Sequence, residues 1–367
     1  MTFCLRIHVG IINLLNRPSR RQKILSLAQS LRRASFCSPG EIVSINLIEA
    51  VDGVSQSFDD LNTRYRLRPF PNWAIPDPDN KFPSSWRKGQ TTGGIASGLS
   101  HLDATSLITT SPAWKPGDYI LILEDDCTLT GDVEKCWDYF LACLVDANQF
   151  VPKWDMLMLG AAGHRFDISP SKPIAESDFI EIAGFSYLTT MYFISEKGVS
   201  KLASCREICL GNMLAFDELH NALANLSNRR DVKTCFAPCL ATPLVLLSST
   251  QSHVRQDPHD CVHDTEVSAG SRVNGVREDS SLGHDVLADT VVPYKMEIEC
   301  ETIYWWRRSD HPIPKNVLND QFGKPRARRK SSVGKTGMLS LMLKHFNKQP
   351  IEEPCGSFPS WEKMVGN

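Results

Sequence analysis

The stretch Tyr119-Ile-Leu-Ile-Leu-Glu-Asp-Asp-Cys-Thr128 decides how the rest of the sequence is interpreted. Its apolar run from Tyr119 to Leu123 is too short for an ordinary helix, and Pro116-Gly117 precedes it. A short apolar run bounded in this way favours a strand that is buried on both faces. Such strands are typical of a sheet with helices on both sides, so we expect an α/β fold.

The carboxylates Glu124, Asp125 and Asp126 follow this strand without a gap. In an open α/β sheet, ligands bind outside the carboxyl ends of the strands. Clustered carboxylates repel one another unless a positive charge neutralises them, and a divalent cation with oxygen ligands would do so. The alternative, which carries equal weight, is a strand that ends in a solvated acidic turn.

Composition places the chain among ordinary globular proteins. It has 367 residues, 42% of them hydrophobic and 22% charged, and a formal net charge of −2, so no global attraction to nucleic acid is expected. The first residues run into a strand-like segment without the pattern of a signal peptide, and no apolar run is long enough to span a bilayer. The scattered cysteines favour reduced thiols, so we expect a cytoplasmic protein.

The amino-terminal segment predicts a β-α-β unit. Ile7–Leu15 is strand-like, Asn16 is a candidate N-cap before Pro18, and Ile42–Ala50 returns as a strand. Asp52 follows that second strand, where an acid can hold a ribose hydroxyl in nucleotide-binding folds. No G-x-G-x-x-G follows the first strand, which disfavours a dinucleotide fold.

Alternating strands and helices continue to about residue 250 and predict a mostly parallel sheet covered on both sides. We therefore expect a domain at 1–250 and a polar, basic, partly disordered extension at 251–367. Residues 54–92 are loop-rich and predict a surface excursion. Further expected elements are helices at Gly93–Leu102, Val133–Ala147 and Asn212–Leu226 and strands at Trp154–Gly160 and Phe185–Ile194.

Two features of the extension have weak functional interpretations. His259-x-Cys-x-His263 has donors for a metal, but a polar loop explains the pattern better. The basic tract from Lys324 to Lys335 precedes a short apolar-faced segment, Met338–Phe346. This arrangement predicts weak peripheral contact with an anionic membrane surface, although a solvated tail is the favoured interpretation.

Six segments form a set whose order and spacing across residues 11–218 are specific: Ile12–Arg21, Ala50-Val-Asp-Gly53, Gly93-Gly-Ile-Ala-Ser-Gly-Leu-Ser-His101, Leu121–Asp126, Trp154–Gly160 and Tyr192–Gly198. Together these segments resemble glycosyltransferase family 25, the group of lipopolysaccharide and collagen galactosyltransferases. The resemblance fades after residue 250. The chain departs from the family pattern at Gly94, where the family has glutamate, and at Ala96, where it has glycine.

The resemblance implies a GT-A type nucleotide-binding sheet flanked by helices, a UDP-sugar donor and a cation, usually Mn²⁺, with Mg²⁺ as the other choice. Galactose or glucose is the expected sugar. The expected acceptor is a glycan or a hydroxylysine side chain, and we favour the glycan because no secretory signal is visible in the sequence. If the glutamate replaced by Gly94 orients the donor, this protein is slower, differently specific or inactive.

The resemblance also suggests roles for residues of the donor site. Glu124 and Asp126 are expected to hold the metal, because alternate residues of an extended strand point the same way, and Asp125 to meet a ribose or sugar hydroxyl. The other expected donor-site residues are Asn13, Leu14 and Asp52 at the base and ribose, Arg17, Arg20 or Arg21 at phosphate, and Ser100 and His101 facing the donor. The arginines are as often merely solvated.

An inverting transfer needs a general base for the acceptor hydroxyl, and Asp217 or Glu218 is the candidate. The alternative is that both are exposed helix carboxylates. Rival functions are an inactive family member that binds sugar nucleotide or carbohydrate, a Mg²⁺-dependent phosphotransferase or nucleotidyltransferase, and a nucleic-acid-binding protein. The near-neutral charge and the missing motifs argue against the last.

Overall fold

The computed structural model describes residues 5–36, 38–68, 70, 91–160, 171–185, 189–227, 229–256, 292–298 and 301–307. All of them lie within the compact unit Met1–Gln321. The predicted His259-x-Cys-x-His263 feature, the basic tract and most of the proline-rich insert fall outside the described residues. Within the described part of the chain, no helix combines the length and apolar character needed to cross a bilayer.

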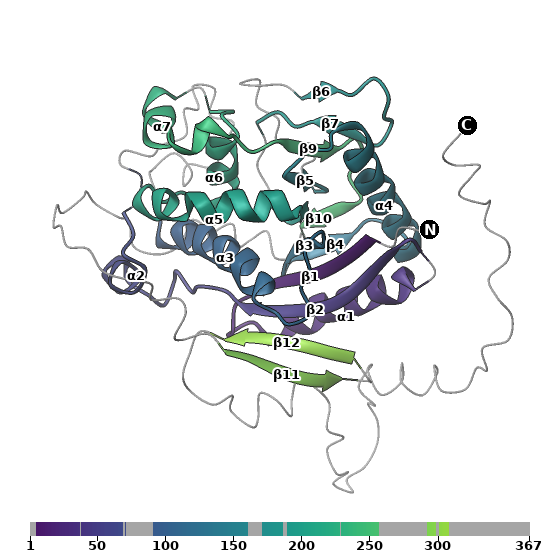
Figure 1. The fold of residues 1–367 in the computed structure, drawn as a ribbon. Helices are drawn as coiled ribbons and strands as arrows, with labels where there is room; N and C mark the ends of the chain where they lie inside the picture. The colour runs from purple at the N-terminus through teal and green to yellow at the C-terminus, as the bar shows by residue number, and fades with distance from the viewer. Residues whose placement is uncertain are drawn as a thin grey trace, which may run out of the picture. The chain divides into compact units, whose positions relative to one another are not determined.

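A 10-stranded sheet forms the centre of the fold, with the strand order β11-β12-β2-β1-β3-β8-β5-β9-β7-β6 (Figure 1). The buried run that follows Pro116-Gly117 is its strand β3, as the sequence predicted. The strands of the sheet are β1 (Leu5–Asn13), β2 (Gly40–Glu49), β3 (Tyr119–Glu124), β5 (Met156–Met158), β6 (Lys172–Pro173), β7 (Ile180–Ile182), β8 (Met191–Ile194), β9 (Leu246–Ser249), β11 (Val292–Ile298) and β12 (Glu301–Arg307). Outside it, β4 (Cys127–Leu129) pairs antiparallel with β10 (Val254–Gln256).

The sheet is mixed, so the expectation of a mostly parallel sheet was wrong. Strands β12, β2, β1 and β3 are parallel neighbours, but β8 pairs antiparallel with both β3 and β5. Helix α4 (Val133–Phe150) lies between β3 and β5 in the chain, and these two strands run in the same direction with β8 inserted between them. The period of the apolar residues reveals a buried strand but not its direction, which the connection decides.

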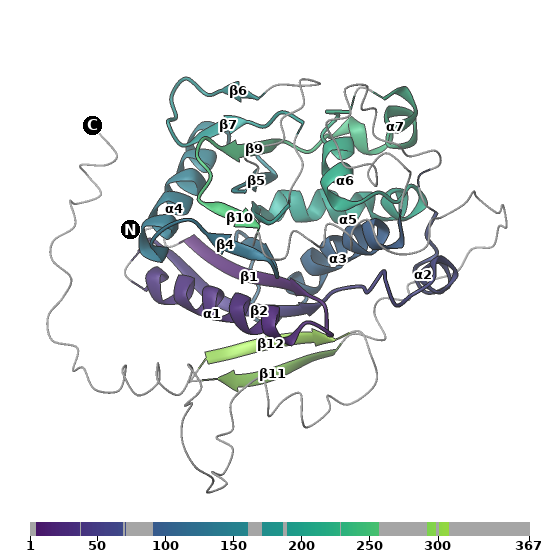
Figure 2. The same ribbon diagram turned by 180° about the vertical axis from the view of Figure 1, so that it is seen from behind.

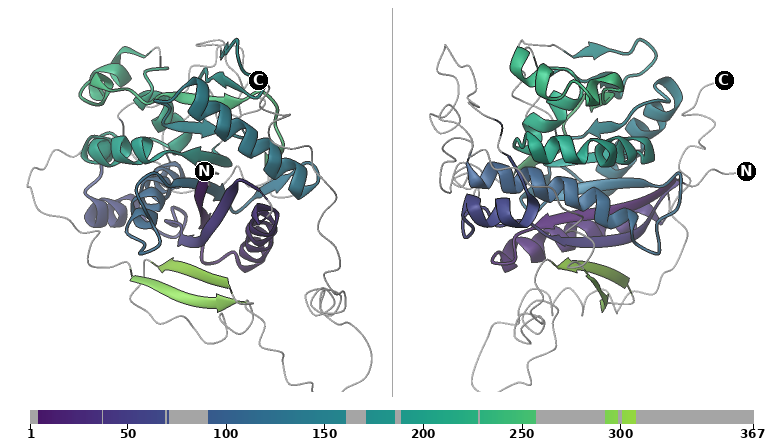
Figure 3. Two further views of the ribbon diagram at one scale, coloured as in Figure 1. Left: turned by 45° about the vertical axis from the view of Figure 1, so that its right-hand side comes forward. Right: turned by 60° about the vertical axis from the view of Figure 1, so that its left-hand side comes forward.

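Helices cover both faces of the sheet, which confirms the α/β fold class (Figures 1 and 3). On one face α1 (Pro18–Ser35) packs against α4, and on the other α3 (Thr92–Thr109) packs against α5 (Glu196–Gly211) and α6 (Phe216–Leu223). Most of the buried apolar core lies on the α3 side, with Ile48, Leu99, Ile122 and Tyr192 among its members. The remaining helices are α2 (Phe58–Tyr65), α7 (Arg230–Cys235) and a 3-10 turn at Cys239–Ala241.

Local contacts explain where the helix bounds differ from expectation. Pro18 is the first residue of α1, and Arg17 rather than Asn16 is its N-cap. Helix α6 begins at Phe216, because the chain before it runs extended and Met213 donates its backbone N–H to the Arg68 carbonyl. Residues 58–65, expected to be irregular, form α2 because Ser57 and Asp60 make a capping box.

A hairpin from the predicted extension completes one edge of the sheet. Strands β11 and β12 pair antiparallel, and β12 lies parallel beside β2 (Figures 1 and 2). The sequence does not alternate clearly here, and Trp305 and Trp306 are adjacent in the chain. The predicted domain boundary near residue 250 stays a prediction, but the sheet draws on residues from both sides of it.

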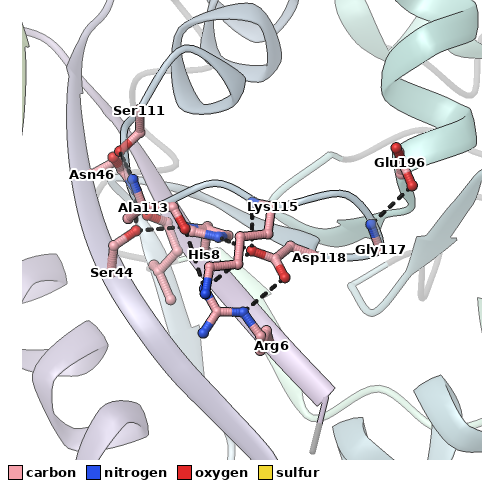
Figure 4. A network of polar contacts seen from close by, with 11 residues as sticks. Arg6, His8, Ser44, Asn46, Ser111, Ala113, Lys115, Gly117, Asp118 and Glu196 are labelled. Atoms are coloured by element: carbon pink, nitrogen blue, oxygen red, sulfur yellow. Dashed lines mark hydrogen bonds and ion pairs between the residues drawn. The ribbon is translucent and has the colours of Figure 1, made fainter.

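A buried polar network ties β1 to the loop before β3 in the amino-terminal half of the sheet (Figure 4). Asp118 accepts hydrogen bonds from Arg6 Nε at 2.9 Å and from His8 Nε2 at 2.7 Å. Because the Nε2–H of His8 is committed to Asp118, Nδ1 accepts from the Ser44 hydroxyl at 2.7 Å. Burial lowers the pKa of His8, with Asp118 opposing the shift. The network holds the sheet together at the end opposite the acidic cluster.

Candidate functional site

The parallel strands β12, β2, β1 and β3 end at one edge of the sheet, which we call the carboxyl edge. It is defined by the last residues of these strands, Arg307, Glu49, Asn13 and Glu124. In the register of the sheet, Asn13 lies beside Glu49 and Ile12 beside Glu124. Charged and amide side chains therefore meet where α/β sheets bind ligands.

Strand β3 ends at Glu124, and Asp125 and Asp126 form a turn before β4. The extended backbone that we assumed across Glu124–Asp126 is therefore not present. Instead, Asp125 and Asp126 share Arg20 as a partner, while Glu124 is bound by other side chains. The cause is the tight β3–β4 connection, which turns the chain at Asp125. The assignment of Glu124 and Asp126 to a metal stays a prediction.

Arg20 lies in the first turn of α1 and is 9% exposed. Its Nη1 is 3.0 Å from Asp125 Oδ1 and 3.8 Å from Asp126 Oδ2. A positive charge in the first turn opposes the helix dipole, and these carboxylates compensate for it. Arg21 is 2% exposed, so neither arginine is a solvated surface residue. Burial lowers the pKa of Arg21 to about 10, against the opposing charges of Glu49 and Asp125.

Asp126 is the most perturbed carboxylate of the cluster. Burial, followed by repulsion from Glu124 and Asp125, raises its pKa to about 8, and Arg20 opposes the shift. Its Oδ2 accepts from Gln256 Nε2 at 3.5 Å, but its buried Oδ1 has no hydrogen-bond partner among the described residues. A buried carboxylate oxygen without a partner is costly. The site is thus suited to a positively charged ligand.

Glu124 is held by a hydrogen-bond relay that runs into the core. His101 Nε2 lies 3.0 Å from Glu124 Oε1, and the Thr189 hydroxyl donates to the same oxygen at 2.7 Å. The other ring nitrogen of His101 lies 3.0 Å from the Tyr192 hydroxyl. Burial alone would raise the pKa of Glu124, but the bonds and charge of His101, with Thr189 and Arg20, outweigh it and lower the pKa. Glu124 is therefore an ionised, oriented carboxylate.

Asn13 connects α1 to the acidic turn. It is 2% exposed, accepts from Arg21 Nη1 at 3.0 Å and donates through Nδ2 to Asp125 Oδ2 at 2.7 Å. Leu14 and Arg17 follow in the turn after β1, where the Arg17 N–H donates to the Leu14 carbonyl at 3.1 Å. The structure therefore brings Asn13 and Asp125 together, whereas Leu14 and Arg17 line the adjacent turn.

The loop after β2 is held beside the loop after β1. Asp52 accepts the backbone N–H groups of Val54 and Ser55, and its other oxygen lies 3.4 Å from Asn16 Nδ2. The Ser100 hydroxyl accepts from the Val51 N–H at 2.9 Å and donates to the Ala96 carbonyl at 2.7 Å. Ser100 thus fixes this loop through bonds within the protein. Its predicted direct contact with the donor stays a prediction.

The candidate bases Asp217 and Glu218 lie in the first turn of α6. Glu218 is 4% exposed and Asp217 is half-buried, so the alternative of two exposed carboxylates was wrong for Glu218. The preceding residue, Phe216, stacks on His101 with ring centroids 4.4 Å apart. This contact places the start of α6 against the relay that holds Glu124.

Several residues of the site had no role in the sequence interpretation. Thr189 and Phe216 lie in segments without a chemical motif, and Tyr192 belongs to a segment matched to the family but assigned no role. Gln256 comes from the polar stretch after residue 248 and reaches Asp126 because β10 pairs with β4. Only the tertiary pairing brings Gln256 to the site, so no local signal could have found it.

Among the described residues, the acidic cluster does not by itself make a complete cation site. In the ranges that the structure describes, no group of three or more His, Cys, Asp and Glu side chains converges as a metal site. A cation at Asp126 would therefore need further oxygen ligands from a bound molecule, and Mg²⁺ and similar cations often take these from substrate phosphates. The unpartnered Oδ1 of Asp126 fits that arrangement.

Comparison with known proteins gives one sequence relative that resembles most of the chain. A glycosyltransferase 25 family member of Aedes aegypti is 26% identical over an alignment of 301 residues, and the match covers 78% of this chain and 44% of the relative. The chain thus spans less than half the length of that curated relative. No family model matches the sequence. The match supports the resemblance that the motifs indicated.

Two solved glycosyltransferase structures match this chain with low TM-scores. One is a glycosyltransferase involved in the glycosylation of the major capsid of PBCV-1, with a TM-score of 0.28 and 9% identity, covering 67% of this chain and 95% of that one. The other is the apo form of the glycosyltransferase GlyE of Streptococcus pneumoniae TIGR4, with a TM-score of 0.23 and 10% identity, covering 66% of this chain and 45% of that one.

Proposed function

We propose that this chain, a relative of glycosyltransferase family 25, is a glycosyltransferase that moves a hexose from a UDP-sugar to a glycan acceptor. Galactose or glucose is the proposed sugar, and inversion at the anomeric carbon the proposed outcome. The observation that carries the proposal is Asp126, whose side chain is 19% exposed but whose Oδ1 is buried without a hydrogen-bond partner among the described residues. Asp126 lies at the carboxyl edge, in the segment that resembles the family's acidic strand end.

The proposed donor site runs along the carboxyl edge from β2 to β3. Asn13 and Asp52 are the proposed partners of base and ribose, because they end or follow the first two parallel strands. Arg20 is the proposed phosphate partner, since its buried guanidinium reaches from the first turn of α1 to the acidic turn. Guanidinium groups bind phosphate oxygens well because their planar N–H donors match them.

A divalent cation, Mn²⁺ or Mg²⁺, is the proposed cofactor, with Glu124 and Asp126 as its ligands from this chain. Bound there with the donor's phosphates, it would stabilise the negative charge on the diphosphate leaving group. His101 and Thr189 keep Glu124 ionised and oriented for this role. Arg20 neutralises part of the acidic charge when the cation is absent.

The acceptor side is proposed to lie near the start of α6. There Asp217 or Glu218 takes the proton of the acceptor hydroxyl as that oxygen attacks the anomeric carbon and UDP leaves. The stacking of Phe216 on His101 supports this placement, because it brings α6 to the relay that holds Glu124. The proposed weak membrane contact depends on the basic tract, which lies outside the described residues.

The second candidate is an inactive relative that binds a sugar nucleotide or carbohydrate. The observation behind it is Gly94, which replaces the family's glutamate. The structure also shows what a residue at position 94 does at the start of α3. Thr91 is the N-cap of α3 and accepts from the Gly94 N–H at 3.1 Å, so Gly94 is the residue where a glutamate would complete a capping box. Loss of the glutamate therefore removes half a helix cap, whatever it does to activity.

Release of UDP from UDP-galactose and UDP-glucose, with Mn²⁺ or Mg²⁺, tests the proposed activity. Wild type should release UDP, more with a glycan acceptor mixture than without, and Asp126→Asn should lose nearly all of this activity while keeping its fold. The inactive alternative predicts binding of UDP without release. Turnover of a nucleoside triphosphate instead of a UDP-sugar would favour the phosphotransferase alternative and contradict the proposal.

A further inference from the structure

The hairpin β11–β12 reaches the donor site through Trp305. This residue is 1% exposed and lies on β12, which is parallel to β2. The Arg21 guanidinium lies 5.5 Å from the centroid of the Trp305 ring, and that of Arg307 lies 5.7 Å from it. Arg307 Nε also donates to Glu49 at 3.4 Å. One indole thus contacts two guanidinium groups. Arg307 ends β12 at the carboxyl edge, and Arg21 belongs to α1.

Arg21 in turn decides which way the Asn13 amide points. Its Nη1 donates to Asn13 Oδ1 at 3.0 Å and to the Leu15 carbonyl at 3.2 Å. A guanidinium has donors and no acceptor, so the oxygen of Asn13 must face Arg21 and the NH₂ group must face away from it. That NH₂ group donates to Asp125 at 2.7 Å. The orientation of Asn13 therefore depends on where Arg21 is held.

We infer that the hairpin β11–β12 is part of the donor site and that Trp305 is its positioning residue. Trp305 holds Arg21 by cation–π contact, Arg21 fixes the Asn13 amide, and Asn13 fixes Asp125 in the acidic turn. Cation–π contact is stronger when water is excluded, and both Arg21 and Trp305 are buried. The further step, in which the oriented Asn13 meets a nucleotide, rests on the proposed function. The chain of contacts from Trp305 to Asp125 does not depend on that function.

The adjacent tryptophan provides a matched control on the same strand. Trp306 is 3% exposed and belongs to the apolar core on the α3 side, whereas Trp305 contacts Arg21 of α1. The Trp306 Nε1 donates to Asn46 Oδ1 at 3.2 Å. Successive side chains of a strand point to opposite faces, so Trp306→Leu disturbs the hairpin and the core but not Arg21.

Hydrogen exchange of the Asn13 side-chain amide tests the inference without any ligand. The full chain is labelled with 15N-asparagine, and its Asn13 signal is identified by its loss in Asn13→Asp. Trp305→Leu should speed exchange by about tenfold, the factor for losing one hydrogen bond to a charged group, and Trp306→Leu should not. Trp305→Phe, which keeps a ring, gives a smaller change in the same direction and is decisive if Trp305→Leu does not fold.

Unchanged exchange in a folded Trp305 variant would overturn the inference. Equal changes in the Trp305 and Trp306 variants would also overturn it, because the hairpin would then act only through overall stability. UDP affinity in the presence of Mn²⁺ is measured on the same samples and should fall in Trp305→Leu more than in Trp306→Leu. If wild type binds no nucleotide, the proposed function fails, while the exchange measurement still decides the role of Trp305.

Discussion

Nη1 of Arg20 lies 3.0 Å from Oδ1 of Asp125 and 3.8 Å from Oδ2 of Asp126, so one guanidinium pairs with Asp125 and lies near the second acid of the turn. The side chains of Arg20 and Asp125 are each 10% exposed. Removing one partner of a buried ion pair leaves the other charge uncompensated. The stability of the acidic turn therefore depends on Arg20 when no cation is bound.

Arg20→Met is expected to lower the free energy of unfolding by about 3 kcal/mol, because it leaves the largely buried carboxylate of Asp125 without its cation. Mn²⁺ should then recover a larger part of the stability than it adds to wild type, because it would take over the neutralising role. Thermal unfolding with and without Mn²⁺ measures both effects. Arg33→Met, at an exposed position in the last turn of the same helix, is the control and should be nearly neutral.

His101 is expected to stabilise both Glu124 and the core. His101→Phe keeps an aromatic ring against Phe216 but removes the hydrogen bonds to Glu124 and Tyr192. It should cost about 1 to 3 kcal/mol in urea unfolding and reduce UDP release strongly. His101→Gln can still donate to Glu124, so its losses should be smaller. Equal losses of stability and of UDP release in both variants would show that the hydrogen bond from His101 to Glu124 does not account for these losses.

His220 is expected to make stability depend on pH. Burial lowers its pKa from 6.5 to about 4, and its side chain is fully buried, with Nδ1 bonded to the Phe216 carbonyl. The unfolded chain therefore binds a proton more readily than the native protein. The stability that the protein gains from keeping His220 neutral and buried is present above pH 6.5, and it is lost as the pH falls toward 4. The expected loss from His220 is about 2 kcal/mol between pH 7 and pH 5.

Urea unfolding at pH 7 and pH 5 measures this dependence. His220→Asn keeps a donor near the Phe216 carbonyl but cannot titrate, so its stability should fall less between the two pH values. His8, whose pKa burial also lowers, acts in the same direction in both proteins. An identical pH dependence of wild type and variant would contradict the assignment to His220.

Gly98 is expected to be needed for the packing of α3. A Cβ at this position would meet the backbone carbonyl oxygen of Leu214, which cannot move aside as a side chain can. Gly98→Ala should therefore destabilise the protein, although alanine is normally favoured over glycine in a helix by about 1 kcal/mol. Gly211→Ala is the control, because a Cβ there meets nothing within 4 Å. In thermal unfolding, Gly98→Ala should lower the midpoint temperature. The change in Gly211→Ala should be of opposite sign or clearly smaller.

The sequence was sufficient to predict the strands that carry the site. The apolar run before Glu124 gave β3, and the pattern of Ile42–Ala50 gave β2, because buried strands and turn residues leave local signals. It did not reveal that Asp125 leaves the strand direction, since a tight connection to β4 follows from pairing with the distant β10. The antiparallel insertion of β8 also has no local signal.

The partners of the predicted residues were harder to predict than the residues themselves. Glu124 and His101 were both singled out, but their mutual bond depends on how α3 packs on the sheet. The arginines of α1 were predicted as either phosphate partners or solvated residues, and sequence alone does not show that Arg21 is covered by Trp305. Contacts between segments so far apart in the chain are set by tertiary packing.

Binding of UDP, measured by calorimetry with and without Mn²⁺, tests the central claim that the acidic cluster at the carboxyl edge is a cation-dependent nucleotide-sugar site. We predict that UDP binds wild type more tightly when Mn²⁺ is present, and that Asp126→Asn loses this dependence while its unfolding remains cooperative. UDP affinity that is the same with and without Mn²⁺, or the same in wild type and Asp126→Asn, would contradict the account.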